Sequence, residues 1–255
     1  MPDPNTSSSP PARPLRYRQI ADDLRQRVED GELGAGRLLP SEASLSAHYG
    51  ASRVTVRRAL ESLRDDGLVD SRQGLGWFVA GDPLRQHLGR LGTIEAQLEA
   101  AGVEPERRVL EFAFVDAPAR VAKILDTPRV LEVVRLNLAD GHPFAQITVW
   151  CPEGLGETLS RADVERTPFY ELLDVELGGA VQTIGATAAG EEAAEVLDVP
   201  VGSPLLRCER ITHSRDGEAV LFSEHLFPAH VTEFVVGLPH ADRSLAPTGI
   251  RLVRP

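Results

Sequence analysis

Hydrophobic residues just after position 40 follow the spacing of a short helix. Leu45 and Tyr49 stand four residues apart, which places both on one face of a helix. Ser41 precedes them and is a residue type that caps helix N-termini. Gly50 follows at the position where a left-handed C-cap requires glycine. The pattern therefore predicts a short helix that ends in a tight turn.

A second helix is predicted directly after this turn, with one apolar and one basic side. Ser52 can cap its N-terminus, and Gly67 can end it. The apolar side repeats every three or four residues through Val56, Leu60 and Leu63. The first two turns carry polar and basic side chains at Arg53, Thr55, Arg57 and Arg58. This segment contains no acidic residue before position 61.

Two short strand-like runs follow, at 68–72 and 77–80, around the glycine-rich segment 73–76. A hairpin behind two such helices predicts a winged helix-turn-helix. A recognition helix presents its N-terminal residues to bases and phosphates, and arginine suits both. An isolated arginine cluster is more often an ordinary solvated helix face, but here the turn, the caps and the hairpin agree. We therefore expect the chain to bind double-stranded DNA.

Strand and helix patterns alternate in the rest of the chain. One predicted hairpin joins 130–138 to 144–150, and another joins 205–213 to 220–227 across a turn that contains Asp216 and Gly217. Further helices are predicted at 93–101, 119–125, 169–177 and 191–197, and further strands at 108–115, 181–188 and 234–238. Strands paired by hairpins with helices between them favour an α+β fold class, with a mainly antiparallel sheet.

Proline and glycine mark the domain boundaries. The first residues are rich in proline and serine and lack an apolar signal core, so we expect a disordered tail. The wing ends at Gly81–Pro83, where the pattern breaks. The predicted organisation is a tail at 1–14, a DNA-binding domain at 15–81, a linker at 82–92, a second domain at 93–240 and a C-terminal tail at 241–255.

Charge is distributed unevenly between the two domains. The chain of 255 residues has a formal net charge of −11, which is unusual for a protein that binds nucleic acid. Residues 1–82 hold 11 basic and 12 acidic groups, whereas residues 83–255 hold 16 and 26. The excess acid therefore lies in the second domain, which does not need to touch DNA.

The remaining composition indicates a cytoplasmic protein. No apolar run approaches the length of a membrane span, so we expect no membrane contact. Cys151 and Cys208 are the only cysteines and are far apart in the chain, which fits free thiols in a reducing compartment. His225 and His230 stand five residues apart, a spacing that does not suit one helix face. We therefore expect no metal and no cofactor.

The ordered motifs of the first domain resemble the GntR family of regulators. The matching stretches are Tyr17–Arg25, Gly31–Gly36, Leu39–Glu42, Ser52–Leu60, Asp66–Val69 and Gly74–Val79. The resemblance implies DNA contacts by the recognition helix and the wing tip. The candidate residues are Ser41, Ser52, Arg53, Thr55, Arg57, Arg58, Arg72, Gln73 and Gly74. Ala43 and Trp77 depart from the family pattern, which changes the expected operator sequence more than the activity.

The second domain resembles the UTRA effector-binding domain of the HutC subfamily, whose fold is similar to that of chorismate lyase. The matching motifs are Asp140–Pro143, Phe169–Leu173, Leu197–Leu206, Asp216–Gly217 and Ser223–Pro228. By position, the resemblance places an effector site at Thr93, Arg135, Asn137, Ile147, Thr167, Tyr170 and Leu221.

Ile147 and Leu221 occupy positions where sugar-sensing members carry glutamates. Aliphatic side chains there disfavour a sugar, because its hydroxyls would lose hydrogen bonds on desolvation. Arg135 can pair with one carboxylate or phosphate. We therefore expect a small anionic, partly apolar effector. The alternative is that Arg135 forms a structural salt bridge and that the pocket is vestigial or lies elsewhere.

Together these features predict a dimeric transcription regulator, a repressor on a pseudo-palindromic operator, rather than an enzyme. A homodimer would place two recognition helices in successive major grooves. Two other functions stay open at this stage. The second domain can be an enzyme tethered to DNA, although we find no catalytic triad, metal set or isolated carboxylate pair. The chain can also be a DNA-binding dimer that responds to no ligand.

Overall fold

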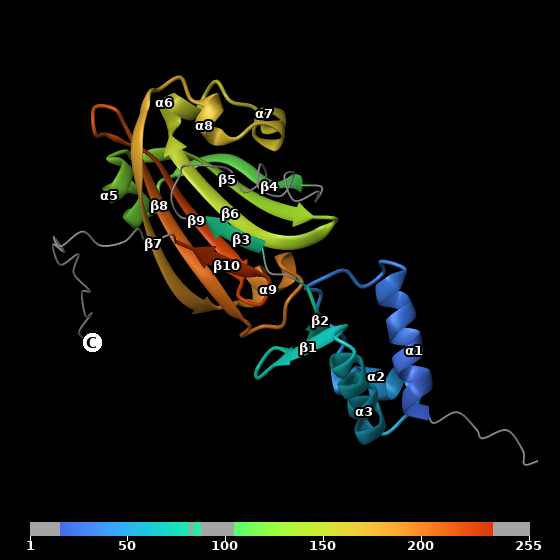
Figure 1. Ribbon diagram of the computed structural model, residues 1–255. Helices are drawn as coiled ribbons and strands as arrows, with labels where there is room; N and C mark the ends of the chain where they lie inside the picture. Colours follow the sequence, from blue (N-terminus) through green and yellow to red (C-terminus); the bar gives the residue numbers. More distant parts are fainter. Residues whose placement is uncertain (1–15, 82–83, 88–104, 237–255) are drawn as a thin grey trace, which may run out of the picture.

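The computed structural model describes residues 16–81, 84–87 and 105–236. Residues 16–81 form a small head of helices with a β-hairpin, and residues 105–236 form a sheet domain (Figure 1). The head lies at one end of the sheet domain. The predicted helix 93–101, both predicted tails and part of the predicted linker lie outside the described residues.

The head has the predicted winged helix-turn-helix layout. Its elements are α1 (Arg16–Glu29), α2 (Glu42–Tyr49), α3 (Arg53–Asp65), β1 (Val69–Arg72) and β2 (Gly76–Val79). The Ser41 hydroxyl accepts the Ser44 N–H at 3.1 Å. Gly50 ends α2 with a φ of 55°, a conformation that favours glycine. The predicted caps and turn are therefore confirmed.

The core of the head is formed by the apolar sides of its helices. Ile20 and Leu24 of α1 pack with Leu60 and Leu63 of α3, and each of these side chains is buried. Because α3 buries one side against α1, its opposite side is left at the surface for other contacts.

The sheet domain is built on a six-stranded antiparallel sheet in the order β4-β5-β6-β9-β8-β7. Its strands are β4 (Pro105–Asp116), β5 (Arg129–Ala139), β6 (His142–Pro152), β7 (Leu177–Ala188), β8 (Pro204–Ser214) and β9 (Ala219–Pro228). The two predicted hairpins are confirmed as β5–β6 and β8–β9. The predicted α+β fold is therefore correct.

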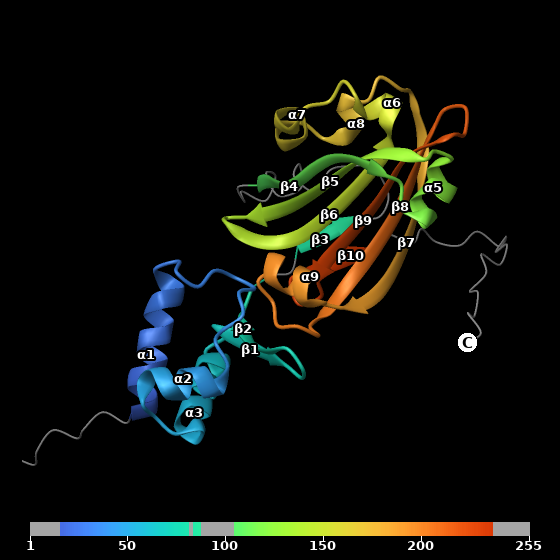
Figure 2. The same ribbon diagram turned by 180° about the vertical axis from the view of Figure 1, so that it is seen from behind.

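Short helices cover the two faces of this sheet. They are α5 (Ala119–Leu125), α6 (Glu153–Gly156), α7 (Arg161–Arg166), α8 (Phe169–Leu172) and α9 (Glu191–Val196). Val164 of α7 and Phe169 of α8 join the largest buried cluster, on what we call the α7–α8 face. Ala194 of α9 and Val121 of α5 pack on the opposite, α5–α9 face. Figure 2 shows α9 close to the head and α6–α8 at the far end.

Three segments differ from the sequence-based expectation. The helix expected at 169–177 ends at Leu172, because the chain enters β7 at Leu177 and pairs with β8 there. The last strand, β10 (Thr232–Val235), does not join the main sheet. It pairs in parallel with β3 (Leu84–His87), a strand inside the segment expected to be a linker. Tertiary pairing therefore orders residues whose local sequence carries no clear strand pattern.

Two further properties follow from the described residues. None of their helices is long and apolar enough to cross a lipid bilayer. Cys151 and Cys208 are free thiols and are buried, and burial raises the pKa of each to about 12.

One histidine lies half-buried on the α7–α8 face. His225 of β9 pairs across the sheet with Ile147 and Cys208, and its Nε2 lies 2.9 Å from the Ser223 hydroxyl. Burial, together with the positive charges of Arg210 and Arg135, lowers the pKa of His225 to about 3. The imidazole is therefore neutral in the folded protein at ordinary pH.

Acid should destabilise the protein through His225. The folded state holds the pKa of His225 at about 3, below the ordinary value of 6.5. The unfolded state therefore binds more protons between these values, so stability is lost as pH falls below 6.5. From pH 6.5 to pH 5 the expected loss is about 2 kcal/mol of unfolding free energy.

Urea unfolding of the protein and of His225→Gln across this range measures the effect. The variant should show a smaller loss on acidification, whereas a change at the exposed His48, His48→Gln, should leave the loss intact. A loss of equal size in His225→Gln would mean that other groups cause the acid sensitivity.

Candidate functional site

The N-terminal turns of α3 present basic and polar side chains on the surface of the head. Arg53 and Arg57 are exposed, and Ser52 caps the helix by accepting the Thr55 N–H at 3.2 Å. The Ser52 and Thr55 hydroxyls lie 2.8 Å apart. The helix thus offers guanidinium groups, hydroxyls and its positive dipole end together, a combination suited to phosphates and base edges.

Arg57 is held in place by residues from two other elements. Its Nε and Nη2 donate to the Glu42 carboxylate at 3.0 and 2.7 Å. The indole N–H of Trp77, on the wing, donates to the same carboxylate at 3.2 Å. These hydrogen bonds lower the pKa of Glu42, so the carboxylate stays ionised. The Glu42 carboxylate of α2 therefore joins α3 and the wing. The link to the wing depends on Trp77, which departs from the family pattern.

The other DNA candidates lie in different surroundings. Arg58 stacks on Tyr17 of α1, with its Cζ 4.4 Å from the ring centroid. Gln73 and Gly74 are exposed at the wing tip. Arg72 contacts the sheet domain instead: its Nη1 donates to the Ala229 carbonyl at 2.9 Å.

The sequence analysis did not single out one exposed apolar residue of α3. Val54 is 79% exposed between Arg53 and Thr55. Its position outside the apolar stripe of α3 was a visible signal, because a valine there contributes nothing to the core. An exposed methyl-bearing side chain at this place can contact a thymine methyl group.

Most predicted effector residues share the α7–α8 face. Cross-strand pairing places Arg135 beside Ile147, and Leu221 lies in the same buried cluster as Ile147. Tyr170 of α8 packs against this cluster. The remaining predicted residues are a buried Asn137 two positions beyond Arg135, a half-buried Thr167 at the end of α7, and Thr93, which lies outside the described residues.

A second guanidinium on this face was missed. Arg210 of β8 donates through Nη1 to the Tyr170 hydroxyl at 2.6 Å, and through Nε and Nη2 to Gln182 at 2.8 and 2.6 Å. These acceptors are neutral, so they do not cancel its charge. Arg210 and Arg135 both lower the pKa of His225, which places both positive charges near the same imidazole. The signal was an arginine at an inward position of β8, two residues from the buried Cys208.

Arg135 contacts an aromatic ring in addition. Its Cζ lies 5.4 Å from the centroid of Phe169, which is itself buried. The face therefore combines two cations, aromatic and aliphatic walls and a neutral imidazole. In the part of the chain that the structure describes, no group of three or more His, Cys, Asp or Glu side chains could hold a metal ion.

Comparison with known proteins identifies both domains. Residues 16–79 match the family model for bacterial regulatory proteins of the gntR family, and residues 100–232 match that for the UTRA domain. An HTH-type transcriptional regulator of Mycobacterium tuberculosis is 35% identical over 92% of this chain and 89% of its own length. The transcriptional repressor NagR of Bacillus subtilis is 27% identical over 86% of this chain and 93% of its length.

Solved structures show the same fold. PhnF from Mycobacterium smegmatis superposes with a TM-score of 0.58 at 23% sequence identity, over 87% of this chain and all of that one. The relatives are transcription regulators and not enzymes. The winged head, the sheet domain and these matches lead to one conclusion: the chain belongs to the GntR family of bacterial regulatory proteins and is a DNA-binding transcription regulator with a UTRA domain.

Proposed function

We propose that this regulator is a cytoplasmic, homodimeric repressor that leaves a pseudo-palindromic operator when its UTRA domain binds a small anionic, partly apolar effector. The observation that carries the proposal is the pair of guanidinium groups, Arg135 and Arg210, on the largely apolar α7–α8 face. Several relatives bear the name repressor, among them NagR of Bacillus subtilis and the mannosyl-D-glycerate system repressor MngR of Escherichia coli.

DNA reading is assigned to the first turns of α3. The carboxylate of Glu42 holds Arg57 along one edge of its guanidinium, which leaves N–H groups on the other edge for a guanine. Holding the side chain in advance reduces the entropy lost on binding. Arg53 and Ser52 stand at the helix N-terminus for phosphate contacts, and Val54 for a thymine methyl group.

A dimer is inferred from the small size and weak charge of the head. Residues 1–82 carry a net charge close to zero, so one head gains little non-specific attraction to DNA. Two heads on one operator combine their contacts, and a two-fold dimer matches a pseudo-palindrome.

The effector class follows from the charges and walls of the α7–α8 face. Arg135 and Arg210 favour a carboxylate or phosphate, because a hydrogen bond donated by a guanidinium group is stronger when its acceptor is charged. Ile147 and Leu221 are buried aliphatic side chains and offer nothing to a sugar hydroxyl. A ligand with one anionic group and an apolar body satisfies both requirements.

Arg57→Ala should weaken operator binding by roughly 1–3 kcal/mol and relax the base preference at one position. The measurement is fluorescence anisotropy on an operator obtained by selection from random DNA, beside a scrambled duplex. Glu42→Gln should give a smaller loss of the same kind, because Arg57 remains but is held less firmly. Equal losses on operator and scrambled DNA would show that Arg57 contacts only phosphate.

The operator should contain two half-sites separated by about one helical turn of DNA, roughly 34–36 Å. Scrambling one half-site should weaken binding at least roughly 100-fold, since the second head loses its partner site. Lengthening the DNA between the two half-sites by half a helical turn should weaken binding similarly, because it turns the second half-site away from the second head. Full affinity for a single half-site, together with a monomeric mass in solution, would contradict the dimer.

Apolar carboxylates or phosphates should stabilise the protein in a thermal-shift screen, and sugar phosphates should not. At a hundredfold excess over the dissociation constant the expected gain is about 2.7 kcal/mol, or roughly 5–10 °C. Arg135→Gln and Arg210→Gln should each reduce the shift. Arg207→Gln changes a neighbouring arginine that pairs with Glu209 and should not. A shift only with sugar phosphates, or with no compound of either panel, would contradict the proposed effector class.

A further inference from the structure

The head and the sheet domain are joined at the turn that follows β9. Arg72 Nη1 donates to the Ala229 carbonyl, and His230 Nε2 donates to the Gly36 carbonyl, each at 2.9 Å. The His230 ring also lies 5.4 Å from the ring of Phe78 on the wing. Burial lowers the pKa of His230, so the ring acts here as a neutral donor. One turn of the sheet domain therefore contacts both the wing and the loop before α2.

Two glycines let the backbone of the head lie close against side chains of the sheet domain nearby. A Cβ added at Gly34 would lie 2.3 Å from the nearest atom of the His142 ring. A Cβ added at Gly36 would lie 2.3 Å from a methyl group of Val231. The loop 31–38 is thus fitted against the β5–β6 turn and the β9–β10 turn, and no larger residue fits at these two points without movement.

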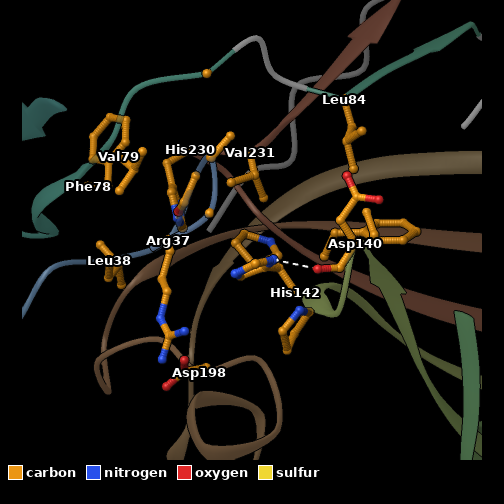
Figure 3. Close-up of a pocket in the computed structure, with 18 of the residues that line it drawn as sticks. Arg37, Leu38, Phe78, Val79, Leu84, Asp140, His142, Asp198, His230 and Val231 are labelled. Carbon is orange, nitrogen blue, oxygen red and sulfur yellow. Dashed lines mark hydrogen bonds between the residues drawn. The ribbon is translucent and has the colours of Figure 1, made fainter. Parts of the chain in front are cut away.

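Between these contacts the two domains line a partly open cavity of about 360 Å³ (Figure 3). Its walls come from the loop 31–38, the end of β2 with Gly81, the turn 139–144, the loop 197–199 and the turn 228–231, with Leu84 beside them. None of the predicted effector residues lines it. The cavity therefore shares no residue with the predicted effector site, although Phe144 in its wall belongs to the buried cluster of the α7–α8 face.

The walls of this cavity are largely apolar, and its few charges are of both signs. Aliphatic and aromatic side chains form most of the lining, including Leu38, Phe78, Val79, Leu84, Phe144 and Val231. Arg37 extends toward Asp198 in Figure 3, and the second carboxylate of the lining, that of Asp140, also has an interaction partner. A charged ligand therefore gains little here, in contrast to the α7–α8 face with its two guanidinium groups.

His142 supplies a hydrogen-bonding group in the wall. Its Nδ1 lies 2.9 Å from the backbone carbonyl of Asp140, which can only accept, so Nδ1 carries the hydrogen. In the neutral imidazole Nε2 is then an acceptor. A ligand N–H or O–H is the complementary group.

We propose that the interdomain cavity is a second small-molecule site, which binds an uncharged, mostly apolar molecule that carries one N–H or O–H donor. Ligand sites in proteins prefer domain interfaces and consist mainly of apolar walls with a few polar groups, in volumes of roughly 300–1,000 Å³. Because both domains form the walls, occupancy is linked to the position of the head relative to the sheet domain.

The test is thiol protection in the full-length protein, with N-phenyl-1-naphthylamine as the uncharged probe. Cys151 and Cys208 are buried, and burial raises the pKa of each to about 12, so both react slowly with maleimides. Ala139→Cys places one reactive thiol in the cavity wall. At ten times its dissociation constant the probe should slow alkylation by N-ethylmaleimide about tenfold, and its fluorescence should saturate at one site per chain.

Ala186→Cys, on the exposed edge strand β7, is the matched control and should be alkylated at the same rate with and without probe. Ala35→Cys repeats the test from the head side, in case Ala139→Cys does not fold. Protection of neither cavity thiol, or equal protection of the control, overturns the proposal.

An Arg135→Gln background separates this site from the proposed effector site. Protection of Ala139→Cys should persist in that background, and its loss there would place the probe on the α7–α8 face and overturn the proposal. Failure of the anionic ligands in the thermal-shift screen would leave the protection result unchanged, so the two proposals fail independently.

Discussion

Backbone pairing between β5, β6, β9 and β8 decides which side chains share the α7–α8 face, because partners across an antiparallel pair point to the same side. This register puts Arg135, Ile147, His225 and Cys208 in one row across four strands. A slip of one residue in any strand would turn its side chains to the other face. Two cations then stand near His225, and their positive charges add to the desolvation of the imidazole in lowering its pKa.

The same strand connects the UTRA domain to the head. β9 carries His225 and Leu221 on the α7–α8 face and then continues into the turn 228–231. That turn contacts Arg72 of the wing and the loop before α2. A change in the packing of β9 can therefore reach the DNA-binding head through the adjoining turn and its two hydrogen bonds to the head.

Prediction from the sequence was accurate for helix caps, turns and hairpins, whose structure depends on neighbouring residues in the chain. Ser41, Gly50 and Ser52 cap or end their helices as expected, since caps depend on the residue itself. Helix 119–125 and the two hairpins were found from their periodicity. The helix expected at 169–177 was wrong in its second half, because pairing of Leu177 with Ser214 outweighs the local helical pattern. Arg210 was missed because only strand register reveals that it faces Arg135 and His225.

The amino-acid sequence by itself determined the two-domain organisation, the winged head with its basic recognition helix, and the α+β class of the second domain. Caps, turns and apolar periods act over a few residues, so they can be found without a structure. Only the tertiary structure showed that Glu42 holds Arg57, that Arg72 binds the sheet domain, and that both domains line one cavity. These features join residues far apart in the chain, and their contacts depend on how the completed elements pack.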